Sequence, residues 1–187
     1  MSGAVAHPET ALSRVVQLDR PVDLRPLLGP LARGSGDPTM RVAATAAIRA
    51  SVTPDGPGSI DIRINGPAAH ARAWGPGARH LLEGLPALLG IDDDPAGFDP
   101  GLHPLVARLA RRHGPVRLGR TVAVWDCLLP AILEQRITGT EAWRNYRRLV
   151  RGHGSPAPGP LGLVLAPTPA EVAALPPWRR ASLATSG

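Results

Sequence analysis

Apolar residues in the first half of the chain mainly follow the two-residue period of β-strands. In residues 59–66, three isoleucines alternate with charged side chains, which is typical of a half-buried strand. The preceding TPDGPG stretch, residues 53–58, is a strong turn signal, so we expect residues 40–52 to pair with this strand in a hairpin. Further strands are predicted over residues 11–18 and 68–74.

Leucines at helical spacing predict two helices in the same half. The first is a short, proline-punctuated helix within residues 21–31. The second lies within residues 75–90, where Pro86 is expected to kink or divide it. Its leucines share one face, which we expect to be buried: Leu81, Leu82, Leu85, Leu88 and Leu89.

The second half of the sequence predicts helices throughout. Thr138 and Glu141 form a capping box that begins one helix, and Thr168 and Glu171 form another that begins a short one. A further helix that ends at His113 is predicted from the spacing of Leu102, Leu105, Val106 and Leu109. The clearest amphipathic segment contains Trp125, Leu128, Leu129, Ile132, Leu133 and Ile137.

An acidic, proline-containing segment, residues 92–100, separates these two halves. We therefore predict an N-terminal α+β domain over residues 1–92 and a helical domain over residues 93–187.

Positive charge is concentrated in the predicted helical half. The chain of 187 residues has a net charge of +6, and all 21 of its basic residues are arginine. Between His103 and Arg151 there are 10 arginines and 3 acidic residues, a net charge of +7. Such a concentration indicates a polyanionic partner, and an arginine-rich solvated surface is the alternative.

Little else in the sequence suggests catalysis or ligand binding. The histidines and the single cysteine, Cys127, lack metal-ligand spacing, so we expect no metal and no cofactor. A lone cysteine fits a reducing cytoplasm, and we expect Cys127 to be a small buried side chain. No signal peptide is evident, and no apolar run approaches the roughly 18 residues that span a bilayer. A cytoplasmic location without membrane contact is therefore predicted.

Arginines at helical spacing are the strongest candidate binding feature. Arg144, Arg147, Arg148 and Arg151 share one helix face, and a second cluster contains Arg108, Arg111 and Arg112. Rows of this kind can contact successive phosphates of a nucleic acid. A solvated helix face explains the pattern equally well.

Residues 125–150 resemble the helix–turn–helix that opens the core of the DNA-3-methyladenine glycosylase II family, within the helix-hairpin-helix DNA glycosylase superfamily. The similarity is carried by AILEQ, residues 131–135, followed by RITGT and an amphipathic helix. Residues 72–100 and 103–120 resemble the actinobacterial branch of the same family, in the family's order. Together these segments cover about two fifths of the chain.

The resemblance implies an α+β fold in which a sheet-and-helix domain like half of the TATA-binding protein precedes an incomplete all-helical glycosylase core. It also implies base excision repair of alkylated bases, with damaged double-stranded DNA as the partner and a nucleoid-associated location. In the family, the residue after the glutamine of this motif fills the space left by a flipped nucleotide, which carries over to Arg136 beside Gln135. We predict this set of DNA-binding residues: Gln135, Arg136, Thr138, Arg144, Arg147 and Arg148.

The sequence departs from the family at the site of hydrolysis. The family's L-P-G-[VI]-G hairpin and the catalytic aspartate beyond it are not found, and Asp126 stands in the wrong place to replace that aspartate. We therefore expect no catalytic residue and a truncated homologue that is inactive by itself. Without the family's closing helices, the apolar faces within residues 125–137 and 149–150 are expected to be exposed.

Two other functions stay open at this point. Residues 124–151 also fit a helix-turn-helix regulator, in which Arg144 and Arg148 would read the bases of one DNA sequence. Alternatively, the chain is an interaction module that completes its core with another protein. A regulator predicts tight binding to one sequence, whereas the glycosylase resemblance predicts weak, salt-sensitive binding that prefers lesions or gaps.

Overall fold

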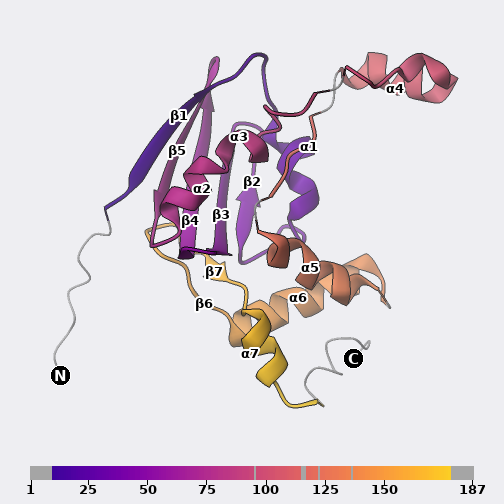
Figure 1. Ribbon diagram of the computed structural model, residues 1–187. Helices are drawn as coiled ribbons and strands as arrows, with labels where there is room; N and C mark the ends of the chain where they lie inside the picture. The colour runs from indigo at the N-terminus through magenta and orange to yellow at the C-terminus, as the bar shows by residue number, and fades with distance from the viewer. Residues whose placement is uncertain (1–9, 95, 115–116, 122, 136, 178–187) are drawn as a thin grey trace.

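The computed structural model describes residues 10–94, 96–114, 117–121, 123–135 and 137–177, and its centre is a five-stranded antiparallel sheet (Figure 1). The spatial order is β1-β5-β4-β3-β2. The strands are β1 (Leu12–Gln17), β2 (Met40–Val42), β3 (Ala46–Thr53), β4 (Gly56–Asn65) and β5 (Ala68–Trp74). The predicted hairpin between β3 and β4 and the predicted strands over residues 11–18 and 68–74 are confirmed.

The segment predicted as one strand over residues 40–52 is instead two strands, β2 and β3. They pair antiparallel through a tight turn, in which the Ala43 N–H donates to the Ala46 carbonyl at 2.7 Å. Neither glycine nor proline marks this turn in the sequence, so the hydrophobic pattern could not reveal it.

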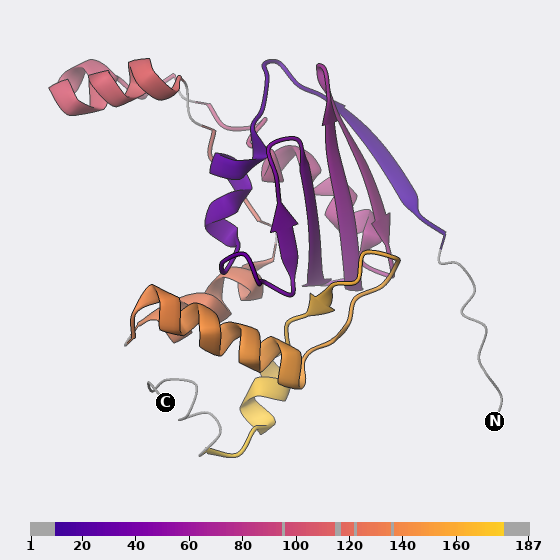
Figure 2. The ribbon, with the colours of Figure 1, turned by 180° about the vertical axis from the view of Figure 1, so that it is seen from behind.

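Three short helices cover one face of the sheet (Figures 1 and 2). They are α1 (Leu24–Leu28), which continues as the 3-10 turn η1 (Gly29–Leu31), α2 (Ala78–Glu83) and α3 (Leu85–Leu88). The predicted helix over residues 75–90 is divided at Gly84, one residue before the turn that contains Pro86. All five of its predicted face leucines are buried. Alanines of β5 face them and let the helices approach the sheet closely: Ala69, Ala71 and Ala73.

Two longer helices, α5 (Val124–Glu134) and α6 (Gly139–His153), pack against each other at one end of the sheet (Figure 1). Both predicted capping boxes are present, one at the start of α6 and one at the start of α7 (Pro169–Ala174). Because α5 begins six residues before Pro130, this proline lies inside the helix, where it is also buried. The core shared by α5 and α6 contains Leu129, Leu133, Ala142, Tyr146, Leu149 and Val150.

The expected exposure of the apolar faces on these helices is largely wrong. Leu149 and Val150 are 1% and 0% exposed, because α5 and the segment before α7 cover them. On α5, Leu129 and Leu133 are buried as well. Leu128 and Ile132, on the outer side of α5, stay about half exposed.

The expected architecture, a sheet-and-helix domain followed by an incomplete all-helical core, is also wrong. The protein is a mixed α/β fold, in which the second half contributes two strands, β6 (Ser155–Pro156) and β7 (Val164–Leu165). Residues 155–165 lie against the face of the sheet opposite α1–α3, where Leu163 and Leu165 pack on Ala50 of β3. The alternation of Leu161, Leu163 and Leu165 has the period of a strand, and this signal was missed among the glycines and prolines. The proposed boundary between residues 92 and 93 stays a prediction.

Helix α4 (Pro104–His113), preceded by the 3-10 turn η2 (Pro100–Leu102), projects away from the rest of the molecule (Figure 1). None of its residues is fully buried. Arg117 and Arg120 return the chain to the body, through an ion pair of Arg117 with Asp19 and a hydrogen bond of the Arg120 N–H to the Ala87 carbonyl.

A buried ion pair joins the sheet to α5. Arg49 of β3 lies on the same face of the sheet as Ile60, and its Nη2 donates to Asp126 Oδ2 at 2.6 Å. The Ser51 hydroxyl donates to the same oxygen at 2.5 Å. Asp126 lies in the first turn of α5, where the helix dipole also favours a negative charge. The side chains of Arg49 and Asp126 are 9% and 15% exposed, so each depends on the other for charge compensation.

We predict that Asp126→Asn destabilises the protein by about 3–5 kcal/mol, because it leaves the Arg49 charge buried without its partner. Urea unfolding followed by circular dichroism measures this. The matched control is Asp23→Asn, which neutralises the exposed partner of Arg25 and keeps an N-cap side chain on α1. Equal midpoints for the two variants would contradict the prediction.

Candidate nucleic-acid interface

The corner between α5 and α6 is polar outside and anchored inside. Gln135 caps the end of α5 and is exposed, and Thr138 is the exposed N-cap of α6. Between them, Ile137 packs against the core of the two helices. Arg136, the predicted wedge, lies outside the described residues. The corner therefore presents Gln135 and the first turn of α6 to solvent, beside a residue that packs on the core.

The row of arginines predicted on α6 separates into two pairs. Arg144 and Arg148 are exposed, and no ion pair or hydrogen bond of theirs is found within the described residues. Arg147 donates from Nη1 to the Arg33 carbonyl at 3.0 Å, and Arg151 donates from Nη2 to the Gly36 carbonyl at 3.0 Å. Two of the four guanidinium groups therefore fasten α6 to the loop after η1, and two remain for a ligand.

Glycines in that loop make the attachment possible. A side chain at Gly34 would come within 3.2 Å of Arg147 and Trp143, and one at Gly36 within 3.3 Å of Arg147. Gly34 also has a φ of +81°, which residues other than glycine rarely adopt. The segment GSGDP, residues 34–38, therefore forms a turn and also leaves room for the Trp143 and Arg147 side chains of α6.

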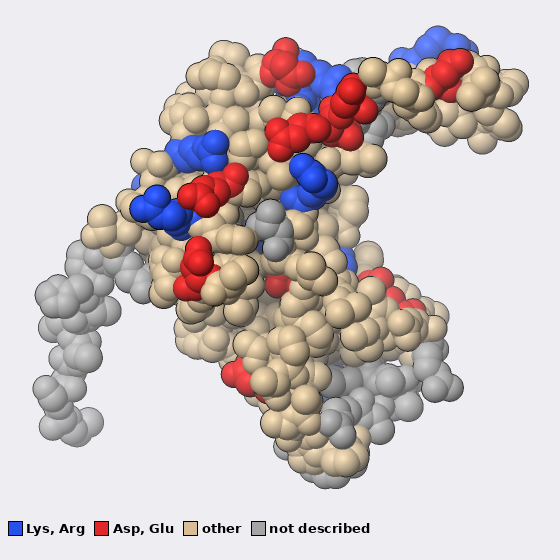
Figure 3. All heavy atoms as spheres, in the orientation of Figure 1, with Lys and Arg blue, Asp and Glu red and all other residues tan. Residues whose placement is uncertain are grey.

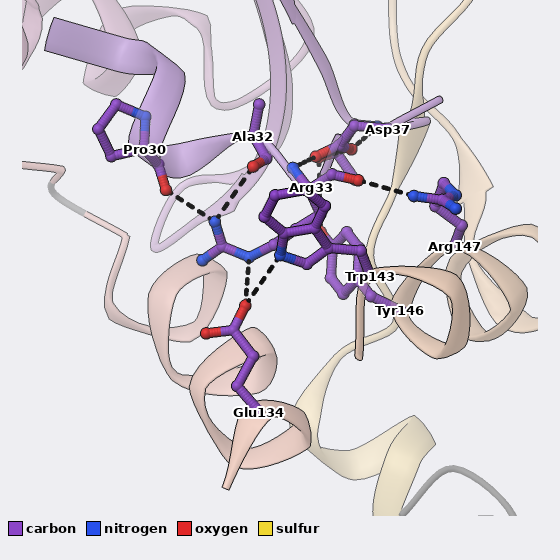
Figure 4. A network of polar contacts seen from close by, with 9 residues as sticks. Pro30, Ala32, Arg33, Asp37, Glu134, Trp143, Tyr146 and Arg147 are labelled. Carbon is purple, nitrogen blue, oxygen red and sulfur yellow. Dashed lines mark hydrogen bonds and ion pairs between the residues drawn. The ribbon is translucent and has the colours of Figure 1, made fainter. Parts of the chain in front are cut away.

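Glu134, the last residue of α5, is held by two side chains that meet at one of its carboxylate oxygens, and we call this arrangement the clamp (Figure 4). Trp143 of α6 donates from Nε1 to Glu134 Oε1 at 3.2 Å. Arg33 Nε lies 3.5 Å from the same oxygen, while Arg33 Nη1 donates to the Pro30 carbonyl at 2.8 Å. These contacts join the end of α5, the middle of α6 and the loop after η1, so they hold the exposed corner next to Glu134 in place.

A buried polar network continues beneath the clamp. Asp37 accepts hydrogen bonds from the Arg33 N–H at 2.7 Å and from the Thr39 N–H and hydroxyl at 2.8 and 2.7 Å. The Tyr146 hydroxyl donates to Thr39 Oγ1 at 3.4 Å. Burial raises the pKa of Tyr146 far above its ordinary value, since the phenolate would be desolvated.

The carboxylates beside this interface are already engaged within the protein. Asp126 binds Arg49 and Ser51, and the cavity next to it has a volume of only about 20 Å³. This space suits a single water molecule and is far too small for a nucleobase. Glu134 is held by Trp143 and Arg33.

The described ranges contain no group of three histidine, cysteine or acidic side chains that could bind a metal ion. Within the same ranges, every helix is too short or too polar to span a bilayer. Cys127 is partly buried, and its Sγ lies 3.3 Å from Thr121 Oγ1.

Sequence reasoning missed the residues that position the corner. Arg33, Trp143 and Glu134 belong to segments that showed only helix or loop patterns, and their meeting requires contacts across more than 100 residues. One signal in the sequence could have indicated the contact between Glu134 and Trp143. The two residues lie nine positions apart, on either side of the turn that the capping box at Thr138 defines.

No protein-family model and no curated protein sequence matches this chain. Among solved structures, it is similar to a 3-methyladenine DNA-glycosylase from Archaeoglobus fulgidus, with a TM-score of 0.72 and 15% sequence identity. The similarity covers 92% of this chain and 62% of the glycosylase chain. The protein therefore has a glycosylase-like fold, and it spans less than two thirds of the length of that neighbour.

We predict that Tyr146, the single tyrosine of the chain, keeps its proton in the folded state well above pH 10. An unfolded tyrosine ionises at about pH 10, so the unfolded state gains stability relative to the folded state as the pH rises past that value. Alkaline titration should show tyrosinate absorbance only together with loss of the circular dichroism signal. The same titration in concentrated urea, where Tyr146 is solvated, is the control. A native titration near pH 10 without unfolding would contradict the burial of this side chain.

Proposed function

We propose that this chain is a DNA-binding relative of the DNA-3-methyladenine glycosylases, which binds double-stranded DNA at a damaged base and acts in base excision repair of alkylated DNA. The glycosylase-like fold over 92% of the chain is the observation that carries the proposal. The exposed corner at Gln135 supports it, because its position between two capped, core-anchored helices suits insertion into a duplex.

The DNA contacts that we propose are made by Gln135, Arg136, Thr138, Arg144 and Arg148. Gln135 and Arg136 would occupy the space left by a flipped nucleotide, since flipping costs a few kcal/mol and a group that fills the gap offsets that cost. Arg144 and Arg148 would bind the flanking phosphates, because both are exposed and uncommitted among the described residues. Arg147 contributes by fixing the orientation of α6.

Recognition without hydrolysis is the second part of the proposal. Hydrolysis of an N-glycosidic bond needs a carboxylate with access to the sugar of the flipped nucleotide. Asp126 is paired with Arg49 beside a cavity of about 20 Å³, and Glu134 is held by Trp143. Neither carboxylate can therefore reach a sugar without breaking the contacts that hold the corner.

The salt dependence of DNA binding tests the assigned arginines. The logarithm of the DNA-binding constant falls linearly with the logarithm of the salt concentration. We expect Arg144→Ala and Arg148→Ala each to make this slope less steep by about 0.9, because each removes one phosphate contact. Fluorescence anisotropy with abasic and intact duplexes measures both slope and lesion preference. Gln135→Ala should reduce the preference for the abasic duplex and leave the slope unchanged, because the side chain is neutral.

The matched control for these variants is Arg79→Ala, which removes an exposed arginine from α2, on the helical layer that covers the sheet. It should bind like the unaltered protein. Equal binding by all the arginine variants would sink the assignment. Tight binding to one undamaged sequence, with no preference for abasic DNA, would favour the helix-turn-helix regulator.

Release of methylated bases tests the second part. We expect the protein to release no 3-methyladenine from alkylated DNA above the spontaneous rate, while it still binds abasic duplexes. Liquid chromatography of the released bases measures this, with an active glycosylase as the positive control. Robust turnover would refute the absence of hydrolysis and leave the proposal of DNA binding intact.

A further inference from the structure

Helix α4 carries an apolar face that the rest of the described chain does not cover. The exposed fractions of Leu102 and Leu105 are 85% and 46%, and Leu109 is exposed to a similar degree as Leu105. Among the other elements, η2 supplies the main contacts of α4, and η2 itself exposes Leu102. A helix with this much exposed leucine is not stabilised by its own packing, because an isolated helix of 10 residues is marginal in water.

Together, η2 and α4 form an arm that projects from the body of the protein (Figure 1). Residues of this arm line an open cleft with a volume of about 910 Å³. Phe98 and Leu118, which are 64% and 67% exposed, line this cleft together with Val106 and Leu109 of α4. Asp93 and Asp94 lie at its edge. The cleft is thus an apolar groove of sufficient size for several leucine side chains, with negative charge beside it.

Charges around the cleft are complementary to each other and unsatisfied. Arg108, Arg111 and Arg112 of α4 are exposed and form no ion pair with any described residue. Two exposed aspartates lie near the cleft: Asp94 lines it, and Asp99 is the N-cap of η2. Among the described residues they accept hydrogen bonds from the backbone N–H groups of Ala96 and Gly101 and form no ion pair. Acidic and basic side chains gather where the arm leaves the body (Figure 3).

We propose that two copies of this chain associate through their α4 arms, each copy packing the leucines of its α4 into the cleft of the other. A surface that carries an apolar face, an apolar groove and both signs of charge is self-complementary under a two-fold axis. The arginines of one α4 then lie near Asp94 and Asp99 of the second copy. DNA and anionic lipid fit this surface less well, because the aspartates at the cleft would repel them.

Molecular mass in solution tests the proposal with the full chain. Sedimentation equilibrium at micromolar concentration should give twice the 19.6 kDa mass of one chain. Leu105→Glu and Leu109→Glu should each weaken association roughly ten-fold or more, since each places a charge in the centre of an apolar contact. Replacing Arg108, Arg111 and Arg112 together by glutamate should weaken it as well, because acidic side chains would then oppose Asp94 and Asp99.

The matched control is Leu128→Glu on α5. Leu128 has the same exposed fraction as Leu105, 46%, and lies on α5, away from the apolar face of α4. It should leave the dimer intact, and unchanged circular dichroism should show that every variant is folded. A monomer at all concentrations, a dimer that survives both α4 substitutions, or a dimer lost on Leu128→Glu would each overturn the proposal. These readouts use no DNA, so they succeed or fail independently of the proposed function.

Discussion

The ion pair between Arg49 and Asp126 fixes how α5 meets the sheet. Arg49 occupies a position on the core face of β3 where the neighbouring strands place Ile60 and Met40, so its charge requires a partner, which Asp126 at the start of α5 supplies. Once Asp126 is placed, the direction of α5 brings Glu134, at the other end of the helix, to the loop that carries Arg33. One buried charge therefore helps to set the position of the corner at Gln135, at the end of the same helix.

The inward side of α6 serves the same end. Arg147 and Arg151 donate to carbonyl groups of the loop around Gly34 and Gly36, so their charges are spent on holding the helix rather than on a ligand. Trp143 adds the contact to Glu134. These donors of α6 and acceptors within the first 40 residues attach the helix beside the corner to the body of the protein. Such attachment suits the proposed insertion into a duplex, since ordering a flexible group would add to the cost of flipping a base.

Local patterns in the sequence predicted most elements of this fold and few of its contacts. Alternation identified β4, leucine spacing identified α2 and α3, and both capping boxes begin helices as expected. The turn between β2 and β3 escaped, because it uses alanines and a threonine in place of turn residues. The strands β6 and β7 escaped because prolines and glycines masked three alternating leucines. The clamp on Glu134 depends on side chains that meet only after the chain has folded, so spacing could indicate α6 arginines on one face without indicating which of them face inward.

The positive charge of the second half is also not one surface. Arg117 and Arg120 pair with Asp19 and Asp92, while Arg147 and Arg151 bind carbonyl groups. Among the described residues, the other exposed arginines of this half lie on the outer side of α6 and on α4, and Asp94 and Asp99 lie near α4. A protein with this distribution has few charges to offer a phosphate backbone at any one site, so electrostatic attraction alone would bind DNA weakly. Under the proposed function, recognition would then depend mainly on the shape of the α5–α6 corner, next to which the Arg49–Asp126 ion pair and the contacts of Glu134 attach α5 to the rest of the protein.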